Sequence, residues 1–101
     1  MDSFALLGTF HAKPGKEAEV ETFLKSALPI ASAEAGTAHW FALKLGPAKF
    51  GIFDTFPTEA GRQAHLTGEI AKALFARAEE LFAVPPQVER VEVLAAKIPH
   101  R

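Results

Sequence analysis

The chain has 101 residues, a length that allows a single domain spanning residues 1–101 and excludes a multidomain protein. Its net charge of −1 gives no reason to expect nucleic acid or a membrane as partner, and the absence of cysteine excludes disulfides and thiolate sites. No apolar stretch approaches the ~20 residues of a membrane span, and residues 1–4 lack the positive start of a signal peptide. We therefore expect a cytoplasmic protein.

The first predicted strand covers residues 4–11 and is largely apolar on both faces, as is typical of a strand covered on both sides. A turn at residues 13–16 leads into a helix whose apolar residues recur at i, i+3, i+4 and i+7. Pro29 lies inside this pattern and is expected to kink the helix or end its first segment. Gly36 is the expected C-terminal cap.

Two further strands are predicted at residues 37–45 and 49–56, joined as a hairpin by a tight Gly-Pro-Ala connection. Pro57 ends the second strand because proline has no N–H to donate to a sheet. A helix follows over residues 58–66. The residues on its inner face are expected to have small side chains, apart from one imidazole: Ala60 or Gly61, Ala64, His65 and Gly68.

Gly68 is expected to bend the join to a second helical segment, residues 70–82, which a Val-Pro-Pro sequence then stops. The last strand is predicted at residues 88–98. The resulting order, β-α-β-β-α-β, is that of a ferredoxin-like α+β domain, with an antiparallel four-stranded sheet and both helices on one face. Because most strands are apolar on both faces and no element remains for the second face, we expect a homodimer packed sheet to sheet.

Several short segments occur in a distinctive order along nearly the whole chain. They are Glu34-Ala-Gly36, Trp40-Phe-Ala-Leu, Phe53-Asp-Thr-Phe56, Ala60-Gly-Arg-Gln-Ala-His65-Leu66, and Pro85-Pro86 before Val91-Glu-Val-Leu. On these segments the chain resembles the antibiotic biosynthesis monooxygenase family of dimeric α/β-barrel proteins. The resemblance implies a pocket between sheet and helices in each protomer. It also implies oxidation of a quinol-, anthrone- or polyketide-type aromatic by O₂ without metal, flavin or other cofactor.

In such a reaction an electron-rich phenolate passes an electron to O₂ itself, so the protein needs a dry pocket and a group that handles a proton. His65 is the candidate catalytic residue, because it matches the family's helix histidine and lies on the stripe expected to face the sheet. An imidazole with a pKa near ~6.5 can share a phenolic proton near neutral pH. The alternative is a structural histidine bonded to a backbone carbonyl or to Asp54.

The candidate substrate-binding residues are aromatic, apart from one carboxylate. Trp40 can stack on a flat substrate and donate its indole N–H, or else lie in the core or the dimer interface. Asp54 lies in an apolar strand face and needs a partner, for which Arg62, Lys44 and His39 are candidates. The rest of the expected lining is drawn from residues that can each also be simple core: Phe10, Phe23, Phe53, Phe56, Phe75 and Phe82. His11, His39 and His100 are not spaced as a metal site.

Three other functions stay open from the sequence. Haem-degrading relatives use an Asn, a Trp and a His, and this chain contains no Asn, which counts against that activity. A non-enzymatic dimer that binds a small hydrophobic molecule or a partner protein fits the lack of Tyr and Asn. Isomerisation or cyclisation of a polyketide-like substrate requires the same kind of pocket, but no O₂.

Overall fold

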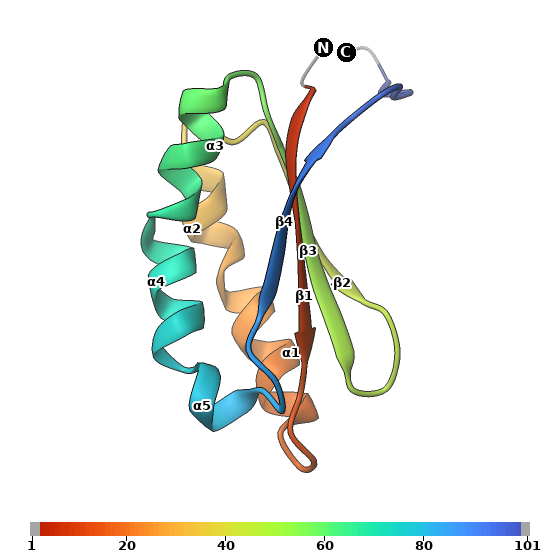
Figure 1. Cartoon of the computed structure of the whole chain (residues 1–101), viewed down its shortest axis with the longest axis vertical. Helices are drawn as coiled ribbons and strands as arrows, with labels where there is room; N and C mark the ends of the chain where they lie inside the picture. Colours follow the sequence, from red (N-terminus) through yellow and green to blue (C-terminus); the bar gives the residue numbers. More distant parts are fainter. Residues whose placement is uncertain (1–2, 100–101) are drawn as a thin grey trace.

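The computed structural model describes residues 3–99, so His100 lies outside the described part of the chain. Strands β1 (Phe4–His11), β2 (His39–Lys44), β3 (Lys49–Phe56) and β4 (Gln87–Glu92) form one antiparallel sheet in the order β2-β3-β1-β4. The helices are α1 (Glu17–Ser26), α2 (Leu28–Ala33), α3 (Glu59–Leu66), α4 (Glu69–Ala76) and α5 (Ala78–Leu81). All of them cover the same face of the sheet (Figure 1). The predicted ferredoxin-like α+β fold is confirmed.

The register of the sheet decides which side chains meet the helices. Leu6 lies opposite Asp54 and Phe10 lies opposite Phe50 in the β1–β3 pair, and all four face the helices. Because successive side chains of a strand point to opposite faces, Phe56 shares this face with them. These side chains are at least 97% buried. The helix-facing side of β1 and β3 is therefore the centre of the core, interrupted by one carboxylate.

Two predictions about the first helical region have different outcomes. Pro29 lies in the first turn of a second helix, α2, so the first helical segment ends before it, as the sequence indicates. Gly36 is not a helix cap, because α2 ends at Ala33 and its cap residue, Glu34, is already extended. Gly36 instead packs against Gly61, where an added Cβ would come within 2.8 Å of the Gly36 carbonyl oxygen. The two glycines thus allow the loop after α2 to approach the first turn of α3.

The last strand is shorter than predicted, ending at Glu92 rather than at residue 98. Glu92 pairs with Phe4, where β1 begins, so within residues 3–99 the following residues have no strand to pair with. The Val93 N–H extends the ladder by one hydrogen bond, donating to the Ser3 carbonyl at 2.8 Å. The strand predicted at residues 37–45 is likewise trimmed to β2, and the segment predicted at residues 70–82 breaks at Arg77 into α4 and α5. Gly68 caps α4 at the predicted bend.

The opposite face of the sheet carries an apolar patch, which we call the open-face patch: Leu7, Phe41, Leu43 and Phe53. Leu7, Phe53 and Phe41 lie in one row across three strands. The rings of Phe41 and Phe53 stack with their centroids 6.5 Å apart, and Phe41 is 50% exposed. Within residues 3–99, no helix lies over this face (Figure 1). Among the same residues, no helix is long and apolar enough to cross a membrane.

Candidate functional site

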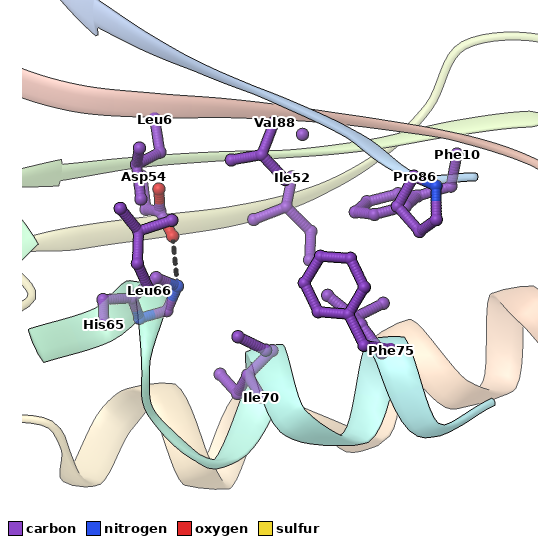
Figure 2. Close-up of a pocket in the computed structure, with 13 residues that line it drawn as sticks. Leu6, Phe10, Ile52, Asp54, His65, Leu66, Ile70, Phe75, Pro86 and Val88 are labelled. Carbon is purple, nitrogen blue, oxygen red and sulfur yellow. Dashed lines mark ion pairs between the residues drawn. The ribbon is translucent and has the colours of Figure 1, made fainter. Parts of the chain in front are cut away.

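A cavity of about 110 Å³ lies between the sheet and the helices α3 and α4 (Figure 2). Its wall is almost entirely apolar. The lining residues are Leu6, Gly8, Phe10, Ile52, Asp54, His65, Leu66, Ile70, Ala71, Leu74, Phe75, Pro86 and Val88. Figure 2 shows Asp54 and His65 at one end of the cavity and Phe10, Phe75 and Pro86 at the other. The only ionisable side chains in the lining are thus gathered at one end.

Local sequence signals bring His65 to this wall. Pro57 follows the last residue of β3, and the Thr58 side chain caps α3 by accepting a hydrogen bond from the Gly61 N–H at 3.0 Å. With the helix start fixed in this way, His65 falls in the last turn of α3 and faces the sheet, with only 9% of the residue exposed. The tilted ring of Phe56 packs on the imidazole, with centroids 5.3 Å apart. Strand and helix together therefore hold the imidazole in one orientation.

His65 lies between two carboxylates. Its Nδ1 is 2.7 Å from Oε1 of Glu34, and its Nε2 is 2.9 Å from Oδ2 of Asp54. Glu34 also accepts a hydrogen bond from the Thr37 hydroxyl at 2.9 Å. An imidazole can donate from both nitrogens only when both are protonated. The geometry therefore favours an imidazolium between two carboxylates, which we call the Glu34–His65–Asp54 cluster.

Opposing effects act on the protonation of His65. Burial disfavours the charged ring and by itself lowers its pKa, whereas the contacts with Asp54 and then Glu34 raise it. The carboxylates outweigh burial, so the pKa of His65 is raised above its ordinary value of 6.5. His65 consequently stays positively charged to higher pH in the folded protein than in the unfolded chain.

This difference predicts a pH dependence of stability. A raised pKa in the folded state means that the contribution of His65 is fully present below the unfolded value of ~6.5 and is lost as pH rises through the folded value. We expect the free energy of unfolding, measured by urea denaturation, to fall as pH increases above ~6.5. In the His65→Gln variant this part of the fall should disappear. Parallel pH profiles for the two proteins would contradict the assignment.

The structure brings together some of the candidate site residues. Asp54, His65, Phe10 and Phe75 line the cavity, and Phe75 is 59% exposed at its mouth. Phe82 does not line it but stacks on Phe10, with centroids 5.5 Å apart. Asp54 pairs with His65 and not with the other suggested partners. Arg62 bonds Glu59 and two backbone carbonyls, Lys44 bonds Glu21, and His39 bonds Thr55.

Other candidates lie away from the cavity. Phe53 belongs to the open-face patch, because it alternates with Asp54 along β3. Phe23 packs at the edge of the core, with the Arg77 guanidinium 5.5 Å from its ring centroid. Trp40 lies beside a separate hollow near Thr37, and its indole N–H is buried with no hydrogen-bond partner. Within residues 3–99, no group of three or more His, Asp or Glu residues is placed to hold a metal ion.

Glu34 is a site residue that the sequence does not identify, because locally it is only an acidic residue two positions before Gly36, the expected helix cap. The signal lay in the topology. In a β-α-β-β-α-β fold both helical regions cover one face, so the end of the first can approach the start of the second (Figure 1). The close contact of Gly36 with Gly61 produces this approach and carries Glu34 to the imidazole.

The same fold occurs in solved structures from other organisms. A provisionally named antibiotic biosynthesis monooxygenase from Nitrosomonas europaea aligns with a TM-score of 0.80 and 14% identity, over 92% of this chain and 91% of its own. A protein from Pseudomonas aeruginosa aligns with a TM-score of 0.79 and 20% identity, over 94% and 97% of the two chains. Identities this low show the fold alone. No family model matches the chain, and no curated protein matches it.

A second structure from Nitrosomonas europaea, that of a protein of unknown function, is much more similar. It is 57% identical and aligns with a TM-score of 0.93 over 98% of this chain and 96% of its own. Similarity at this level over the full length shows common family membership. The chain therefore belongs to the family of this Nitrosomonas europaea protein, within a fold shared with proteins named as antibiotic biosynthesis monooxygenases.

Proposed function

We propose that this protein is a cofactor-independent monooxygenase that oxidises a small hydroquinone-like aromatic with O₂. The observation that carries the proposal is the Asp54–His65 pair at one end of a cavity that is otherwise apolar. Such a cavity excludes water from the reacting atoms, and the buried pair handles the proton of a bound hydroxyl group. The Nitrosomonas europaea structure that is 14% identical carries the name of an antibiotic biosynthesis monooxygenase, and this name supports the proposal as an analogy between folds.

The reaction balances without any further reagent. The deprotonated hydroquinone gives an electron to O₂, and the resulting superoxide combines with the ring radical at a carbon atom to form a peroxide. Loss of water from this peroxide leaves a carbonyl group. One hydroquinone and one O₂ thus give one hydroxyquinone and one water. The protein's part is to hold the ring, favour its anion and keep water away.

The positive charge of His65 suits the developing phenolate, since an imidazolium in a dry site stabilises an adjacent anion more strongly than it does in water. Glu34 keeps the ring charged and oriented through its 2.7 Å contact with Nδ1. Phe10 and Phe75 supply flat apolar surface at the far end of the cavity. In this proposal His65 is the catalytic residue and Glu34 positions it.

Oxygen uptake with a panel of hydroquinones and anthrones tests the proposal. We expect the His65→Gln variant to lose about 10²- to 10³-fold in kcat/KM, the range for removal of one group that stabilises a developing negative charge. His39→Gln is the matched control, because it removes an imidazole that bonds Thr55 and does not line the cavity. Uptake no faster than in buffer, with ligand binding retained, would instead favour a non-enzymatic binding protein. Product formed without O₂ would favour an isomerase or cyclase.

We also infer that the open-face patch is covered by a second copy of the chain. A two-fold axis brings identical surfaces together, so one apolar patch can cover its own copy. Phe41 and Phe53 stack on each other within this patch, and the half-exposed ring of Phe41 would be buried by the second sheet. The homodimer expected from the sequence is thus retained as a proposal, with this patch as its centre.

A further inference from the structure

Asp54 is an unusual residue for the wall of an apolar cavity. Only 1% of it is exposed, and its Oδ2 lies 2.9 Å from His65 Nε2. Its Oδ1 is buried and has no hydrogen-bond partner among residues 3–99. A buried acceptor without a donor is costly to the fold. Such a group at a cavity wall indicates a place for a ligand that donates a hydrogen bond.

His65 does not fill this role itself. Both of its ring nitrogens already face carboxylates, at 2.7 Å and 2.9 Å, so no nitrogen lone pair is directed into the cavity. A ligand hydroxyl that enters the cavity consequently meets Asp54 as the acceptor. His65 acts on the ligand through its charge.

The charge of the site restricts the ligand further. Two carboxylates and one imidazolium sum to −1, in a largely apolar cavity where charges are poorly screened. A carboxylated ligand would therefore be repelled, whereas a neutral hydroxyl group would be attracted. Size gives a second restriction, because an apolar cavity of ~150 Å³ accepts one benzene ring. At about 110 Å³ this cavity is smaller than that, so a single ring fits only with part of it directed toward the exposed Phe75, and a second fused ring is excluded.

We propose that the cavity selects an uncharged, single-ring phenol whose hydroxyl group donates a hydrogen bond to Asp54. This inference rests on the proposed function and narrows its substrate class, setting aside fused-ring anthrones and carboxylated rings. Upon reaction, the O–H bond of the phenol breaks and its proton passes to the Asp54 carboxylate. The phenolate left behind lies beside the positive charge of His65.

Binding measured by calorimetry in the absence of O₂ tests the inference. The probes are 4-methylphenol, its methyl ether, 4-hydroxybenzoate and 2-naphthol. A hydrogen bond to a charged acceptor predicts that 4-methylphenol binds about 10- to 100-fold more tightly than the ether. We expect the benzoate and the naphthol to bind more weakly than 4-methylphenol as well. An ether that binds as tightly as the phenol would overturn the proposal.

Four variants assign the effect to Asp54. Asp54→Leu keeps the branching at Cγ without the carboxylate and should abolish the preference for the phenol over the ether, whereas His65→Gln should retain it. Asp54→Asn keeps an acceptor without the charge and should admit the benzoate. Ala71→Phe narrows the cavity and should weaken the phenol and the ether alike, so it serves as the control for size.

The outcomes separate this inference from the proposed function. Selective phenol binding that depends on Asp54, without oxygen uptake, would leave the inference standing and remove the monooxygenase proposal. If the protein consumes oxygen but Asp54→Leu does not change its preference for the phenol, the monooxygenase proposal stands and this inference is overturned.

Discussion

Replacing His65 with alanine is expected to destabilise the folded protein by about 3–5 kcal/mol, the usual cost of removing one partner from a buried ion pair. The substitution would leave the carboxylate of Asp54, 1% exposed, without its positive partner. A domain of this size is stable by only ~5–15 kcal/mol, so the loss is a large share of the total. Urea unfolding followed by circular dichroism measures it directly.

The matched control is His39→Ala, which removes an imidazole whose Nδ1 lies 2.9 Å from the Thr55 hydroxyl. Loss of one such hydrogen bond is expected to cost about 0.5–1.5 kcal/mol. The double variant His65→Leu/Asp54→Leu should recover much of the loss, because an apolar pair of similar volume avoids the desolvation of two charges. If His65→Ala were no less stable than His39→Ala, the cluster would not carry the energy assigned to it.

The order of the elements was predictable because each has a strong local signal. The i, i+3, i+4 pattern fixed the helices, and Pro29 and Gly68 marked real helix boundaries. The predicted strand ends were wrong where pairing with a distant segment decides how long a strand is. In the described part of the chain the last strand stops at Glu92, opposite the first residue of β1, Phe4, and no local pattern reveals that limit.

The candidate site was only partly predictable, for a similar reason. His65 and Asp54 stood out as polar residues within apolar patterns, and both line the cavity. Phe53 was grouped with them although strand alternation already separates it from Asp54, so that error was avoidable. Glu34 reaches His65 through a contact between two glycines, Gly36 and Gly61, and the distance between the loop after α2 and the first turn of α3 is not encoded locally.

The open face of the sheet gives the second large prediction, that Phe41→Glu converts the proposed dimer into a monomer. The two-fold axis brings one new carboxylate from each protomer into the interface, and buried or like charges there cost several kcal/mol. A loss of about 2–4 kcal/mol weakens dimerisation by roughly 30- to 900-fold. Sedimentation equilibrium measures the change. Phe75→Glu is the matched control, since Phe75 is equally exposed but lies on α4, on the helix side. If the wild-type chain sediments as a monomer, or if both variants behave alike, the open-face patch does not hold a second copy.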